Sequence, residues 1–101
     1  MEQGEYAKDI NLAVSMARDM VKVVKTVLNQ WVEYALKKGI AEAIRFAEQM
    51  AQNNQLRRNM RDAYSQIVRV CSRIKQVPME RQERLLCYLR RAFTCVEKGT
   101  I

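Results

Sequence analysis

The sequence contains no histidine, and glycine and proline are scarce, with three and one in 101 residues. Histidine is the commonest general base and a frequent metal ligand, so its absence argues against most acid–base and metal-dependent catalysis. The sequence also has neither a glycine-rich phosphate-binding loop nor a serine elbow motif. We therefore expect a protein that is not an enzyme and that binds no metal and no cofactor.

Cysteine is also scarce, and Cys71, Cys87 and Cys95 form no Cys-x-x-Cys pair. Zinc sites need close pairs of Cys or His, and an odd set of cysteines does not suit a disulfide framework. No apolar run approaches the roughly 18 residues of a membrane span, and the first residues lack the basic and apolar segments of a signal peptide. These absences predict a cytoplasmic protein with reduced thiols and no membrane contact.

The chain is rich instead in apolar and charged residues, which make up 49% and 29% of the sequence. This balance and the chain length are typical of one globular domain, here residues 1–101. The net charge of +7 is unevenly placed, because residues 1–55 hold seven basic and seven acidic groups, while residues 56–101 hold eleven and four. Nine of those eleven cations are arginine, which matches phosphate or carboxylate better than lysine does.

Apolar residues recur at alternating spacings of four and three between residues 5 and 37, without an intervening Gly or Pro. They are Ile10, Val14, Ala17, Val21, Val24, Leu28, Trp31 and Ala35. This period places them on one side of a helix and predicts a single long helix over residues 5–38, ended by Gly39. The valine-rich stretch at residues 21–27 has strand propensity and is the place where such a helix would bend.

Three further helices are predicted over residues 40–52, 55–76 and 78–97. The polar run at residues 52–55 and the proline at position 78 separate them, because proline suits the first position of a helix and disfavours helix in the preceding residue. Short connections between four amphipathic helices favour an all-α, up-down four-helix bundle with a long N-terminal helix.

A second apolar stripe lies beside the first on the predicted long helix. Its main members are Met16, Met20, Val23, Val27 and Tyr34. Two stripes cover more of the helix than a single neighbour can bury, so two interpretations stay open. Either these side chains pack against the other three helices, or they form a face for self-association or for a partner protein.

Arginine recurs at helical spacing on one face of the helix predicted at 55–76. This row, with its flanking member, consists of Arg57, Arg58, Arg61, Arg69 and Arg73. A second row on the last helix contains Arg84 and Arg91, with Tyr88 alongside. Two rows lining one groove would hold a nucleic-acid backbone while Tyr88 stacks on a base. The alternatives are an ordinary solvated surface and a surface that docks on an acidic protein.

Parts of the second half resemble a known family. The segments are Ala47–Ala51, Gln55–Ile67 and Leu86–Arg91, and they resemble the small helical subunit of CRISPR effector complexes of the Cascade, Csm and Cmr types. The resemblance implies a non-catalytic bundle that acts in antiviral defence, present in several copies in a ribonucleoprotein. It also implies that Arg57, Arg58 and Arg61 contact the guide–target duplex or a displaced strand.

The sequence therefore predicts a non-catalytic, sequence-independent nucleic-acid-binding subunit of a larger ribonucleoprotein. Its expected partners are the backbone of RNA or DNA, other subunits of the complex and further copies of itself. One alternative is a protein-interaction module, such as a viral or phage inhibitor, that docks on an acidic partner. Another is a dimeric DNA-binding regulator that uses the long helix as its dimer seam.

Overall fold

The computed structural model describes residues 2–99, except for the side chains of Glu2, Gln3 and Glu5. It contains five α-helices and one short 3₁₀ helix: α1 (Glu2–Arg18), α2 (Lys25–Lys38), α3 (Ile40–Ala51), α4 (Arg58–Cys71), η1 (Ser72–Gln76) and α5 (Met79–Lys98). No strand occurs between residues 2 and 99, so the predicted all-α class is confirmed. The number of helices differs from the prediction.

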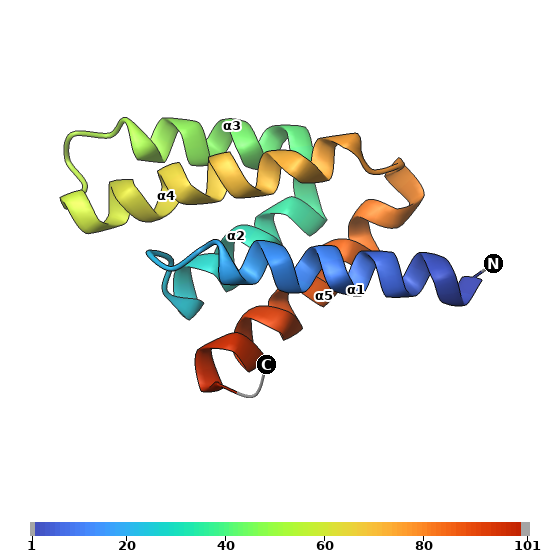
Figure 1. Cartoon of the computed structure of the whole chain (residues 1–101). Coiled ribbons are helices and arrows are strands. Elements are labelled where there is room, and N and C mark those ends of the chain that lie inside the picture. Colours follow the sequence, from blue (N-terminus) through green and yellow to red (C-terminus); the bar gives the residue numbers. More distant parts are fainter. Residues whose placement is uncertain (1, 100–101) are drawn as a thin grey trace.

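The helices form two pairs that are joined by α2 (Figure 1). Helices α3 and α4 run antiparallel as one pair, and α1 packs on α5 as the other. Near the start of α1 and α5, Asp9 meets Arg84, and near their ends Ala17 and Phe93 line one cavity, so these two helices run parallel. The structure is therefore a five-helix arrangement and not the predicted up-down bundle of four helices.

The predicted long helix over residues 5–38 is wrong, because the chain leaves the helix after Arg18 and re-enters it at Lys25. The backbone amide of Lys22, which a continuous helix would use internally, donates instead to Gln66 Oε1 of α4 at 2.6 Å. β-Branched valines at positions 21, 23 and 24 lower the local helix propensity and make the break less costly. The break folds the two halves into a domain with principal extents of 47 × 30 × 18 Å.

The break divides the first apolar stripe, whose members Ala17, Leu28, Trp31 and Ala35 stay buried while others are exposed. Val21 and Val24 of the first stripe are 82% and 56% exposed, and Ile10 is 46% exposed. The second stripe is in the core instead, with Met16, Met20, Val23 and Val27 all buried within the single chain. Tyr34 is half-buried and stacks on Phe46, with ring centroids 4.7 Å apart. The structure thus corrects the proposal of an association face on this stripe, since its side chains already pack against the other helices.

The core is centred on Trp31 of α2, which is 1% exposed. Its indole Nε1 donates to the Ala43 carbonyl oxygen of α3 at 2.8 Å, so the ring is both packed and hydrogen-bonded. Gly39 makes the corner between these two helices with a φ of +91°, a value that residues with a Cβ rarely adopt. Every α-helix contributes large buried side chains to the core, including Met16, Leu28, Ile44, Ile67, Leu85 and Leu89.

The later boundaries agree with the sequence prediction to within a few residues. Helix α3 ends at Ala51, one residue early, and α5 begins at Met79, directly after Pro78. Helix α4 begins three residues later than predicted, because Asn53 Oδ1 accepts the Gln55 amide at 2.9 Å and extends the turn. The last turn of the predicted 55–76 helix tightens into η1.

Candidate nucleic-acid interface

Helix α4 presents an arginine row to solvent because its apolar residues all face the other way. Ala63, Ile67 and Val70 pack in the core, and helical spacing places Arg58 and Arg69 on the opposite side, where both are exposed. The Arg58 side chain is 87% exposed, and its Nε lies 4.0 Å from Asp62 Oδ2, at the limit of an ion pair. Arg69 has no carboxylate partner among the described residues.

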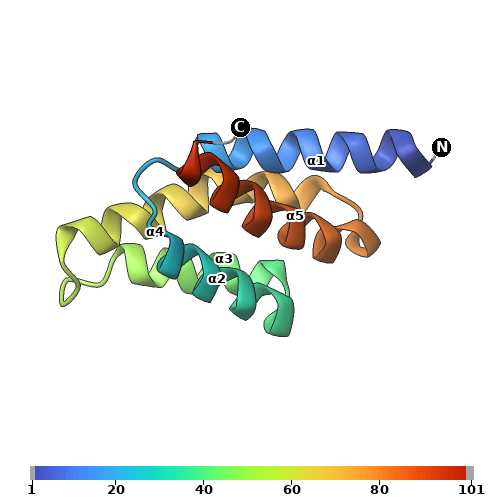
Figure 2. The same ribbon diagram turned by 90° about the horizontal axis from the view of Figure 1, so that it is seen from below.

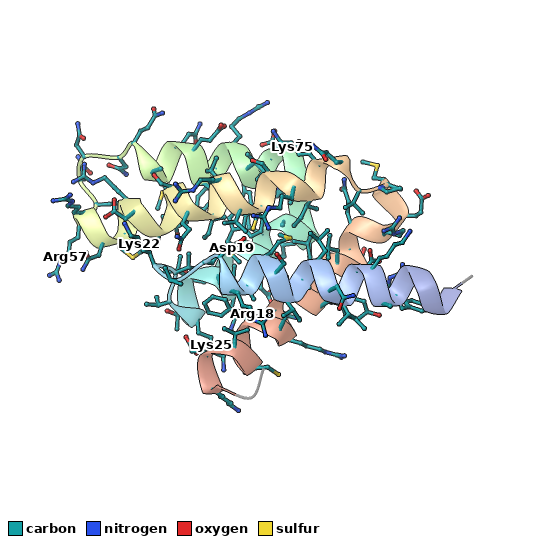
Figure 3. The ribbon with its side chains drawn as sticks, viewed as in Figure 1. Arg18, Asp19, Lys22, Lys25, Arg57 and Lys75 are labelled. Atoms are coloured by element: carbon teal, nitrogen blue, oxygen red, sulfur yellow. The ribbon has the colours of Figure 1, made fainter. Side chains whose placement is uncertain are left out.

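The α1–α2 connection lies along one edge of this row and adds a further cation. Gln66 of α4 holds the Lys22 amide, which leaves the Lys22 side chain exposed beside α4 (Figure 3). Arg57 is exposed at the start of α4, where it is the N-cap residue. We call this surface the α4 basic face, and it consists of Lys22, Arg57, Arg58 and Arg69.

Two residues of the predicted α4 row, Arg61 and Arg73, do not belong to the α4 basic face. The Arg73 Nη2 donates to Asp19 Oδ2 at 2.7 Å, so Arg73 is paired with the residue that directly follows α1. Arg61 is half-buried on the flank of the helix, and its Nε is enclosed without a hydrogen-bond partner. The outward row is therefore shorter than the sequence suggested.

The predicted row on α5 is occupied at one end by a buried carboxylate. Asp9 of α1 is completely buried and lies between Arg81 and Arg84. Arg81 Nη2 is 2.7 Å from Asp9 Oδ1, and Arg84 Nη2 is 2.8 Å from Asp9 Oδ2. The Arg84 guanidinium also stacks on the Tyr6 ring, 4.2 Å from its centroid. We call this cluster the Asp9 clamp.

The clamp perturbs the acid–base behaviour of the carboxylate. The hydrogen bond from Arg81 is the main cause that lowers the pKa of Asp9 below its ordinary value; burial opposes the shift, and the hydrogen bond from Arg84 adds to it. Sequence reasoning did not single out Asp9 or Arg81. The sequence did hold a signal for Asp9: it lies four residues before Ala13 and therefore shares the side of α1 that is buried.

The two arginine rows do not line one groove. Helix α4 packs on α3, whereas α5 packs on α1 and α2. The rows instead meet opposite ends of α1, since Arg73 pairs with Asp19 and Arg84 pairs with Asp9. Beyond the clamp, α1 and α5 enclose a separate groove of about 240 Å³. Its lining includes Tyr88 and Arg91, together with Ile10, Val14 and Cys95.

Two of the cysteines in the described chain, Cys71 and Cys87, are free thiols. Cys71 is buried against Met20, and its burial raises the pKa of the thiol to about 12, so it stays protonated at neutral pH.

We expect the Asp9 clamp to make stability sensitive to acid. Because folding lowers the pKa of Asp9, its contribution is present above the unfolded-state pKa of about 3.9 and is lost as the pH falls through the folded-state value. The melting temperature of the wild-type protein should therefore fall more steeply between about pH 5 and pH 3 than that of Asp9→Asn. The control is Asp62→Asn, which removes an exposed carboxylate. Equal acid slopes for the wild type and Asp9→Asn, measured by circular dichroism, would contradict the assignment.

A comparison with protein-family models, curated proteins and solved structures finds no significant match to this chain. Within residues 2–99, no cluster of three or more His, Cys, Asp or Glu side chains is placed to bind a metal ion. No helix in the described part of the chain has the length and apolar character needed to cross a membrane.

Proposed function

We propose that this protein is a non-catalytic, sequence-independent nucleic-acid-binding subunit of a larger ribonucleoprotein, with the α4 basic face as its contact surface. The observation that supports this proposal best is the exposed state of Arg57, Arg58, Arg69 and Lys22. None of them has an ion-pair partner closer than the 4.0 Å contact between Arg58 and Asp62, within the described residues. The proposal agrees with the CRISPR small-subunit resemblance of the sequence.

The shape of the face favours backbone contact over base reading. Arg58 and Arg69 are eleven positions apart on one helix, so at about 1.5 Å per residue they span roughly 16 Å. That span covers several phosphates of a nucleic-acid strand, at about 3.4 Å per phosphate along a duplex. A convex helix surface reaches phosphates with flexible guanidinium groups, which bind them in a bidentate way and carry no sequence information.

Removing the two outermost arginines tests the proposal directly. The variant Arg58→Ala/Arg69→Ala should bind labelled RNA and DNA more weakly in fluorescence anisotropy. The slope of log affinity against log salt should fall by about 1.4–1.8, because two phosphate contacts are lost at about 0.7–0.9 each. The matched control is Lys38→Ala/Arg45→Ala, which removes two exposed cations from the corner between α2 and α3.

Two outcomes of this experiment count against the proposal. An equal loss in both double variants would mean that net charge, and not the α4 basic face, governs binding. No binding of the wild-type protein to single-stranded or duplex RNA or DNA at low salt would exclude autonomous binding. That second outcome would favour the alternative function, in which the α4 basic face docks on an acidic protein.

The second apolar stripe is buried, so assembly with further copies needs another surface. At the α1–α2 connection, Val21 and Val24 are exposed beside Lys22 and Lys25. Helix α5 begins towards the opposite end of the molecule (Figure 2). There the 81%-exposed Met79 lines a groove of about 350 Å³.

The charges of these two ends are complementary in part, since the groove is lined by a carboxylate that is unpaired in the described structure and also by Lys38. Glu83 lines the groove near Met79, and neither it nor the nearby Glu80 has an ion-pair partner among the described residues. Lys22 and Lys25 flank the exposed valines at the other end. We infer that a second copy places its valines in this groove with its Lys25 against these carboxylates, which leaves Lys22 on the α4 basic face. Such a head-to-tail contact repeats in an open chain.

A further inference from the structure

The first part of α1 is held to the domain by a buried carboxylate, that of Asp9. Among the described side chains from residue 6 to residue 12, Asp9 is the only one that is fully buried. Tyr6 and Ile10 are 37% and 46% exposed, Leu12 is half-buried against the core, and the first fully buried apolar side chain is that of Ala13. Among the described side chains of this segment, residues 6–12 of α1, the ionic contact of Asp9 is therefore the most deeply buried attachment to α5. We call this segment the α1 strap.

The contact that holds the α1 strap has the geometry of an anion site. Arg81 and Arg84 approach the two oxygens of one carboxylate with both Nε and Nη2 atoms, at 2.7–3.4 Å. A guanidinium fork offers the same pattern of parallel N–H donors to a phosphate group. The arginine side chains keep 23% and 26% of their surface exposed, so solvent reaches the rim of the site.

We propose that Arg81 and Arg84 form a phosphate-binding pair whose place is taken in this structure by the Asp9 carboxylate. The ligand is the phosphodiester backbone of a nucleic acid, so this inference rests on the proposed function. Binding there requires the α1 strap to leave α5, and Asp9 therefore acts as an internal competitor. The strap regulates the protein by keeping two of its arginines occupied until a strand displaces it.

Displacement of the strap would also lengthen the basic surface. Positions 81, 84, 88 and 91 follow each other at spacings of three and four, so they share one side of α5. Arg91 and Tyr88 already line the groove that continues from the clamp along the α1–α5 seam. With the strap released, Arg81 and Arg84 would join them in a row about 15 Å long at about 1.5 Å per residue.

The variant Asp9→Asn tests the competition, with Glu48→Gln as the matched control. Both variants remove one negative charge, but Glu48 is an exposed α3 residue without an ion-pair partner in the described structure. Asp9→Asn should bind labelled single-stranded RNA severalfold more tightly than Glu48→Gln. Its salt slope should be steeper, by about 0.7–0.9 for each further phosphate that is neutralised. Adding Arg81→Gln and Arg84→Gln should abolish the gain. Equal affinity and slope in the two single variants would overturn the proposal.

Hydrogen exchange on the wild-type protein gives a readout that does not depend on any variant folding. Amides of residues 6–12 should exchange faster when single-stranded RNA is bound, because the strap has left α5. Unchanged or increased protection of these amides in the bound state would overturn the proposal.

The two proposals fail in different ways. If Arg58→Ala/Arg69→Ala weakens binding while Asp9→Asn behaves like its control, the α4 basic face stands and the strap mechanism is wrong. If Asp9→Asn binds more tightly while the α4 variant behaves like its own control, the nucleic-acid contact lies on α5 and not on α4.

Discussion

Trp31→Ala should leave the protein largely unfolded at room temperature. Truncating a buried tryptophan to alanine costs about 3–5 kcal/mol, and Trp31 is 1% exposed. The same change leaves the Ala43 carbonyl oxygen without its indole donor, which costs roughly 1–3 kcal/mol more. A domain of this size is stabilised by only about 5–15 kcal/mol in total. Urea unfolding followed by far-ultraviolet circular dichroism measures the loss.

Trp31→Phe separates the two causes. Phenylalanine keeps most of the apolar volume at the junction of α2 and α3 but cannot donate to Ala43, so we expect a loss of a few kcal/mol and a folded protein. An alanine variant that is within about 1 kcal/mol of the phenylalanine variant would show that the ring does not fill the core as the structure indicates.

Met20→Asp should be far more damaging than Val21→Asp, although the two positions are neighbours. Met20 is 1% exposed and lies against Cys71, so a carboxylate there is buried without a partner, at a cost of several kcal/mol. Val21 is 82% exposed, and substitutions at such sites usually change the stability by no more than about 0.5 kcal/mol. Thermal unfolding of dilute samples measures both effects.

The pair also distinguishes the broken helix from a continuous one. The apolar spacing that predicts one helix over residues 5–38 puts Val21 on its main buried stripe, so a continuous helix would make Val21→Asp the damaging change. A reversed ranking would therefore contradict the break after Arg18. In concentrated samples, Val21→Asp should in addition lower the sedimentation-equilibrium mass if copies associate through the exposed valines. An unchanged mass distribution would argue against that contact.

Helix positions after residue 40 could be predicted from the sequence because their signals are local. Gly39 and Pro78 mark boundaries by their own backbone properties, and the apolar period of α3, α4 and α5 gives the buried side of each. The valine-rich stretch at residues 21–27 indicated a bend, but the complete break after Arg18 could not be predicted from local signals. It depends on Gln66, which captures the Lys22 amide from 44 positions away.

The same distinction applies to the candidate sites. The exposed position of Arg58 and Arg69 follows from the core residues of their own helix, so a sequence pattern finds it. The Asp9 clamp joins residues 72 and 75 positions apart, and only the packing of α1 on α5 brings them together. For the same reason, the sequence pattern places Arg84 in a row expected to bind phosphates, whereas in the structure it is bound to a carboxylate.

The parallel contact between the first and last helices has a consequence for the order of folding. Helices α3 and α4 are joined by a short loop and can pair as soon as both have left the ribosome, because local contacts form fast. Helix α1, although it is synthesised first, has to wait for α5, the helix on which it mainly packs. During that interval its apolar side is exposed, which favours aggregation or capture by a chaperone. We therefore expect α1 to dock late, after a nucleus of α2, α3 and α4 has formed.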